Sequence, residues 1–140
     1  MNWRISKEDQ RFKDAFLKLE VPPSDFSHRS HVRLAYIFLT ELDVNEAYSA
    51  VKRAIQAFLS HFDIDSSKYH ETLTMAWLLA VKHFMMKTPL ATSAADFIEQ
   101  NLTLLDSGIM LTHYSKEQLF SDEARQAFVE PDLDAIPLYS

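Results

Sequence analysis

A single glycine, Gly108, stands among the 140 residues of this chain. Tight β-hairpins and β-bulges use glycine wherever the backbone needs a positive φ, so such scarcity argues against a β-rich fold. It also removes any glycine-rich loop of the kind that binds phosphate. We therefore expect the chain to build its core from helices.

Apolar residues recur at helical spacing in six segments, separated by short polar connections. This pattern predicts an all-α fold, an up-down helical bundle of about five to six helices with an extended C-terminal tail over residues 131–140. The second, third and fourth helices should form its centre, and Gly108 should adopt the left-handed conformation that often ends a helix. The expected helices cover residues 7–19, 24–42 or 27–42, 45–62, 68–87, 94–105 and 115–128.

Length and composition fit one domain over residues 1–140. The chain has no cysteine, which excludes disulfides, thiolate zinc sites, iron–sulfur clusters and cysteine catalysis. Its polar N-terminus is unlike a signal peptide, and no apolar run approaches the ~20 residues that span a bilayer. We therefore expect a cytoplasmic protein that does not bind membranes.

Acidic side chains are concentrated in the last third of the chain. The net charge is −6, and residues 93–140 hold nine acidic but only two basic side chains. Such a surface repels phosphate backbones, so nucleic acid is not an expected partner. The oligomeric state does not follow from the sequence.

Two short histidine-containing stretches lie near the starts of the second and fourth expected helices. The first contains His28 and His31, and the second contains His70 and Glu71. Helices separated by one antiparallel neighbour run parallel, so both stretches should lie at the same end of the bundle. At 100° per residue the three histidines fall on the core-facing sides of their helices, which predicts a shared site.

A divalent metal is one interpretation of this site. His28 and His31 are neighbours at i and i+3, and His70 would supply a third ligand while leaving an open position. Glu71 points about 100° away from His70, so it fits better as a group that supports the ligands, or as a catalytic base acting through a bound water, than as a ligand itself. Zinc, iron, nickel and manganese all accept such ligands.

A second interpretation needs no metal. Helix N-termini attract anions, and Arg29, Arg33 and Arg125 would help to bind a carboxylate or phosphate substrate. His70 and Glu71 would then form an acid–base pair, with Tyr69, Thr74 and Tyr114 orienting the ligand. In a catalytic site of either kind, metal-assisted hydrolysis or acid–base proton transfer is the expected chemistry, because the chain carries no cofactor motif.

The stretches Phe26-Ser27-His28-Arg29-Ser30-His31-Val32 and Tyr69-His70-Glu71-Thr72-Leu73-Thr74, together with residues 114–133, resemble a group of small bacterial α-helical proteins with H-R-x-H and Y-H-E-T motifs. The resemblance implies a stand-alone bacterial helical domain and implies no activity. The clustering of histidines at one end of a bundle is also similar to DinB-like metal-binding bundles, although the spacings differ.

The sequence thus leads to two hypotheses about function. The first is a small-molecule enzyme or ligand-binding protein with a histidine-rich site. The second is a non-enzymatic regulatory or interaction domain, in which the histidines are structural and the acidic segment 122–134 meets a basic partner.

Overall fold

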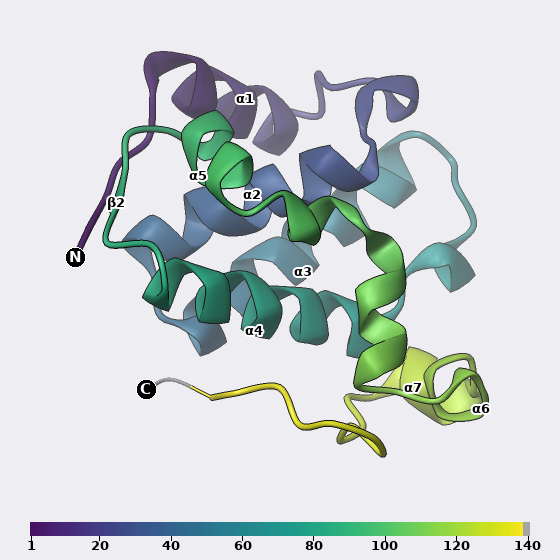
Figure 1. The fold of residues 1–140 in the computed structure, drawn as a ribbon. Helices are drawn as coiled ribbons and strands as arrows, with labels where there is room; N and C mark the ends of the chain where they lie inside the picture. Colours follow the sequence, from purple (N-terminus) through teal and green to yellow (C-terminus); the bar gives the residue numbers. More distant parts are fainter. Residues whose placement is uncertain (139–140) are drawn as a thin grey trace.

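The computed structural model describes residues 1–138 and confirms the all-α fold. Figure 1 shows the chain; Tyr139 and Ser140, the last residues of the expected tail, lie outside the described part. Within residues 1–138, short 3₁₀ helices, η1 to η4, connect the longer elements. In chain order the elements are β1 (Asn2–Trp3), α1 (Lys7–Leu17), η1 (Pro23–Asp25), α2 (His28–Glu41), α3 (Val44–His61), η2 (Ser66–Lys68), α4 (Glu71–Met86), β2 (Leu90–Ala91), α5 (Ala94–Gln100), η3 (Leu102–Leu105), η4 (Ser107–Thr112), α6 (Lys116–Leu119) and α7 (Asp122–Gln126).

Side-chain caps explain where the long helices begin. Ser6, Ser27 and Asp43 each accept a backbone N–H three residues later, and the residue at that later position bonds back to the capping residue. These capping boxes satisfy donors that a helix N-terminus leaves unpaired. The expected starts of the first three helices therefore agree with the structure to within a few residues.

Gly108 does not end a helix in the left-handed conformation that the sequence predicts. No described glycine has a positive φ, and Gly108 lies inside η4. The left-handed positions are instead Leu19 (φ 64°) and Asp63 (φ 56°), just after α1 and α3. Bonds from Glu20 N to Ala15 O and from Ile64 N to Leu59 O close both turns, which offsets the cost of a positive φ in a non-glycine residue.

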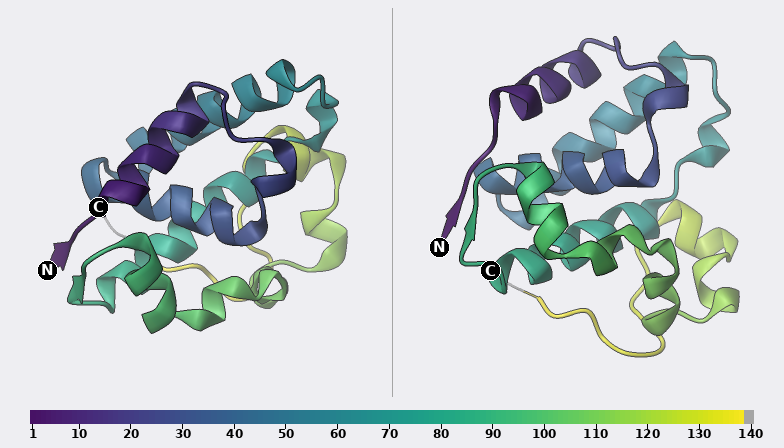
Figure 2. Two further views of the ribbon diagram at one scale, coloured as in Figure 1. Left: turned by 90° about the horizontal axis from the view of Figure 1, so that it is seen from above. Right: turned by 45° about the horizontal axis from the view of Figure 1, so that its top comes forward.

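Helices α2, α3 and α4 pack against one another at the centre, as expected, and most of the buried apolar side chains come from them. Figure 1 shows α2 and α4 running in the same direction, with α3 in the opposite one, and α1 lies over α2 and α3. The further views place α5 beside α2, and α6 and α7 at the N-terminal end of α4 (Figure 2). The parallel course of α2 and α4 brings their N-terminal ends together.

The N-terminal segment forms a feature that the helical pattern did not predict. Strand β1 pairs in parallel with β2, with Asn2 opposite Leu90 and Trp3 opposite Ala91. The Trp3 indole N–H lies within hydrogen-bond distance of the carbonyl oxygens of Met85 (3.1 Å) and Thr88 (2.7 Å). The first residues are thereby fastened to the C-terminal end of α4.

The last third of the chain is less helical than expected. The helix expected over residues 94–105 ends at Gln100, and the one expected over 115–128 divides into α6 and α7. Ser121 causes the second break, because its side chain caps α7 by accepting the Ala124 N–H. The extended tail is held by a bond from Leu133 N to His113 O and by the buried Ile136 side chain. No helix within residues 1–138 is long and apolar enough to cross a membrane.

Candidate functional site

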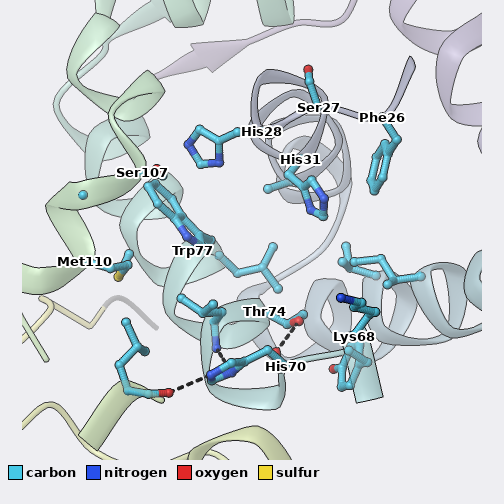
Figure 3. A pocket seen from close by; sticks show the side chains of 18 of the residues that line it. Phe26, Ser27, His28, His31, Lys68, His70, Thr74, Trp77, Ser107 and Met110 are labelled. Carbon is cyan, nitrogen blue, oxygen red and sulfur yellow. Dashed lines mark hydrogen bonds between the residues drawn. The ribbon is translucent and has the colours of Figure 1, made fainter. Parts of the chain in front are cut away.

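A pocket of about 560 Å³ lies at the N-terminal ends of α2 and α4 (Figure 3). We call it the histidine pocket, because His28, His31 and His70 all line it. Its walls are mostly apolar and include Trp77 on α4 and Phe26 before α2. Exposed Leu111 and Phe120, at 36% and 54% relative exposure, also line it. The complete lining is Phe26, Ser27, His28, His31, Ala35, Val51, Ile55, Lys68, Tyr69, His70, Leu73, Thr74, Trp77, Leu78, Ser107, Gly108, Met110, Leu111, Leu119 and Phe120.

Both ring nitrogens of His70 make hydrogen bonds to the backbone. Its Nδ1 accepts the Leu73 N–H at 3.1 Å and caps α4, while its Nε2 lies 2.7 Å from the Leu119 carbonyl oxygen, to which it donates (Figure 3). Burial, and to a lesser extent the charge of Arg125, keep the pKa of His70 below its ordinary value despite the Leu119 bond. Both ring nitrogens are occupied, so His70 joins α4 to α6.

The other two histidines differ from each other in how they are held. His28 Nε2 donates to the Leu104 carbonyl oxygen at 2.9 Å, and its ring packs edge-on against Trp77. The His31 ring packs beside Phe26, with 4.1 Å between the ring centroids, and makes no hydrogen bond within residues 1–138. His31 is exposed to solvent through the open pocket, but the protein packed around its ring, and then the neighbouring His28, lower its pKa to about 4. His31 therefore faces the pocket as a neutral imidazole with both ring nitrogens available.

The predicted metal ligands line the same pocket but do not form a ready metal site. Among the described residues, no group of three or more histidine, cysteine, aspartate or glutamate side chains is arranged to hold a metal ion. His70 would have to give up one of its two hydrogen bonds to act as a ligand. A divalent metal bound by His28, His31 and His70 therefore remains a prediction made from the sequence.

Glu71 lies outside the histidine pocket and lines a second, smaller cavity of about 420 Å³, here called the Glu71 cavity. Its buried carboxylate accepts the hydroxyl of Tyr48 and the amino group of Lys52, the latter at 2.7 Å. Burial raises the pKa of Glu71, but the bonds from Lys52 and Tyr48 outweigh it, so the pKa is lower than usual. Glu71 is thus an ionised group turned towards α3.

The residues predicted to bind substrate are divided between the two cavities. Thr74 lines the histidine pocket, and its hydroxyl donates to the His70 carbonyl oxygen. Arg125 lines the Glu71 cavity, and Tyr69 lines both. The buried Tyr69 hydroxyl interacts with Glu71 and Thr74 closely enough to affect its pKa, although it forms no well-shaped hydrogen bond within the described chain. Arg29 is exposed and lines neither cavity.

Two residues that matter for the pocket were not among those predicted. Trp77 forms one wall, and Lys68 is its one permanently charged lining residue in the described chain. In the sequence, Trp77 could have been recognised by its position on the apolar stripe of α4, seven residues after His70, but that position also fits ordinary core packing. The one sequence feature that pointed to Lys68 was its position next to Tyr69 and His70.

No family model matches the chain, and neither a curated protein nor a solved structure matches it. Function is therefore inferred from the pocket itself.

Replacing His70 tests its role as a structural link. His70→Ala removes the α4 cap and the bond to Leu119, so we expect a loss of about 2 kcal/mol in the free energy of unfolding. His70→Asn should recover roughly half of it by restoring the cap alone. Urea unfolding measures both variants, with exposed His61→Ala as the control. A His70→Ala protein as stable as the control would contradict the structural role.

The same contacts predict an acid sensitivity. The lowered pKa of His70 means that the unfolded chain binds the proton more readily. The stability due to His70 is therefore complete above about pH 6.5, the usual pKa of histidine, and declines as the pH falls below it. In urea unfolding across this range, the difference between wild type and His70→Asn should shrink towards acid. A constant difference would argue against it.

Proposed function

We propose that the protein binds a small, largely apolar molecule in the histidine pocket, with His31 as its polar anchor. The observation that carries this proposal is the His31 ring, which faces a cavity of about 560 Å³ and has no hydrogen bond within the described chain. Small-molecule pockets have about this volume and combine apolar walls with a few polar groups that orient the ligand. The histidine pocket has both properties.

The state of His31 suits ligand binding. With a pKa of about 4 the ring is neutral at pH 7, so it offers one hydrogen-bond donor and one acceptor. His28 and His70 use one or both ring nitrogens in hydrogen bonds to backbone groups, so His31 is the pocket histidine that makes no hydrogen bond within the described chain. A ligand hydroxyl, amide or carboxylate would supply the partner.

The divalent metal and the enzymatic activity remain part of this proposal as predictions. His28 and His31 would be the first ligands to consider, because His70 uses both ring nitrogens. Elemental analysis of untagged protein, beside a His31→Ala variant, measures metal content directly. Near-stoichiometric metal that is lost in the variant would support the metal site.

A dye titration tests the pocket without knowledge of the natural ligand. N-phenyl-1-naphthylamine is an uncharged aromatic dye whose fluorescence rises in apolar surroundings. We expect saturable binding of one dye per chain. His31→Trp fills the pocket and should weaken binding by about tenfold or more, because the dye must compete with the new side chain for the same space.

Two controls make this test specific. His61→Trp places the same residue on the exposed surface of α3, outside the pocket, and should leave dye binding unchanged. His31→Ala should change the free energy of unfolding by no more than about 0.5 kcal/mol, because the ring has no hydrogen bond to lose. Equal dye binding by the His31→Trp and His61→Trp variants would contradict the proposed pocket.

A further inference from the structure

The histidine pocket has a charge balance opposite to that of the whole chain. The chain carries 20 acidic residues and a net charge of −6. Yet no aspartate or glutamate is among the described residues that line the pocket, and Lys68 is the one lining residue with a permanent charge. A ligand in this pocket therefore meets a positive group and no negative one.

Lys68 has its amino group available for a ligand. It makes no ion pair within 4.0 Å in the described chain. The charge of Lys68 does act on Asp65, whose pKa is lowered mainly by hydrogen bonds from Ser67 and least by Lys68. Asp65 does not line the pocket. Figure 3 shows the Lys68 amino group on the same side of the pocket as His31 and Thr74.

Two helix N-termini add to the positive potential. Ser27 and His70, the N-caps of α2 and α4, both line the pocket. These helices have 14 and 16 residues, long enough for a full macrodipole at each end. Parallel helices place two positive ends at one cavity, where a negative group is stabilised. The unpartnered His31 ring supplies a hydrogen-bond donor at the same place.

We propose that the ligand of the histidine pocket is a small apolar carboxylate. Its carboxylate would bind Lys68 and the His31 N–H, and its apolar body would lie against Trp77 and Leu73. This proposal rests on the proposed function, since it names the class of ligand for the same pocket. An aromatic or branched body fits the rings of Trp77 and Phe26 better than a charged or strongly polar one.

Three probes of equal length and different charge test the proposal: 4-phenylbutyrate, 4-phenylbutan-1-ol and 4-phenylbutylamine. Titration of the ¹⁵N-labelled full chain, followed through its amide chemical shifts, gives both the binding site and the dissociation constant. We expect the carboxylate to bind about fivefold more tightly than the alcohol, the upper range for an ion pair with an exposed side chain such as Lys68. The amine should bind most weakly of the three.

Lys68→Met assigns this preference to one side chain. It keeps the length of the side chain and removes the charge, so it should weaken carboxylate binding about fivefold and leave alcohol binding unchanged. Lys116→Met is the matched control, because Lys116 is exposed and lies outside the pocket lining. It changes the net charge equally and should leave both ligands unaffected.

The outcomes separate the two proposals. Equal binding of carboxylate and alcohol, or equal effects of Lys68→Met and Lys116→Met, would overturn the carboxylate proposal while the pocket stands. Dye binding without any shift from the carboxylate would overturn it as well. If the dye also fails to bind, the proposed function itself falls.

Discussion

Asp9→Ala should remove about 3 kcal/mol from the free energy of unfolding, the low end of the range for a buried ion pair that loses one partner, because Arg33 is 30% exposed. The Asp9 carboxylate is buried, at 2% relative exposure, and joins three parts of the fold. It accepts the backbone N–H of Ser6 at 3.0 Å, the backbone N–H of Ala94 at 2.8 Å and the guanidinium of Arg33 at 3.1 Å. Alanine leaves these donors without an acceptor.

The pKa of Asp9 supports the prediction that its carboxylate stabilises the fold. Burial raises it, but the bonds from Ala94, Ser6 and Arg33 outweigh burial and lower it below the usual range. The ionised Asp9 carboxylate is thus the form that accepts the hydrogen bonds joining α1, α2 and α5. Chemical denaturation at pH 7 measures the loss, and Asp14→Ala on the exposed side of α1 is the control. Asp9→Asn keeps one acceptor and should cost less. Equal stability of Asp9→Ala and Asp14→Ala would contradict the role.

Local signals explain why most of the fold could be predicted from the sequence. Apolar periodicity and capping residues act within a few residues, so the starts of α1, α2 and α3 and the central position of α2 to α4 agree with the structure. Pairings between distant segments leave no such signal. Strand β1 pairs with residues nearly 90 positions away, and Asp9 reaches Ala94 across a similar separation.

The site could be predicted in part for the same reason. Helix geometry placed His28, His31 and His70 on inward faces, and the parallel course of α2 and α4 brings them to one pocket. What each ring does there depends on partners that periodicity cannot reveal. His70 bonds to Leu119, which is 49 residues further along the chain, and His28 bonds to Leu104, which is 76 residues away. Among these three rings, only His31 has no hydrogen-bond partner within residues 1–138.

Glu71→Gln should lower the free energy of unfolding by about 2 kcal/mol at pH 7, within the range for hydrogen bonds to a charged group. The carboxylate is buried and accepts both Lys52 and Tyr48, so a neutral amide keeps the shape and loses the charged acceptor. Lys52 is partly exposed, which keeps the cost below that of a fully buried pair. Glu123→Gln on the exposed surface of α7 is the matched control.

The pH dependence distinguishes loss of charge from loss of packing. Because the pKa of Glu71 in the folded chain is lowered, the unfolded chain binds its proton first as the pH falls. The stability due to Glu71 is therefore complete well above about pH 4.3, the usual pKa of glutamate, and disappears as the pH falls through the lower folded value. Unfolding curves of wild type and Glu71→Gln should converge towards acid. A gap that stays constant between neutral pH and pH 3 would mean that the Gln variant is destabilised by packing alone.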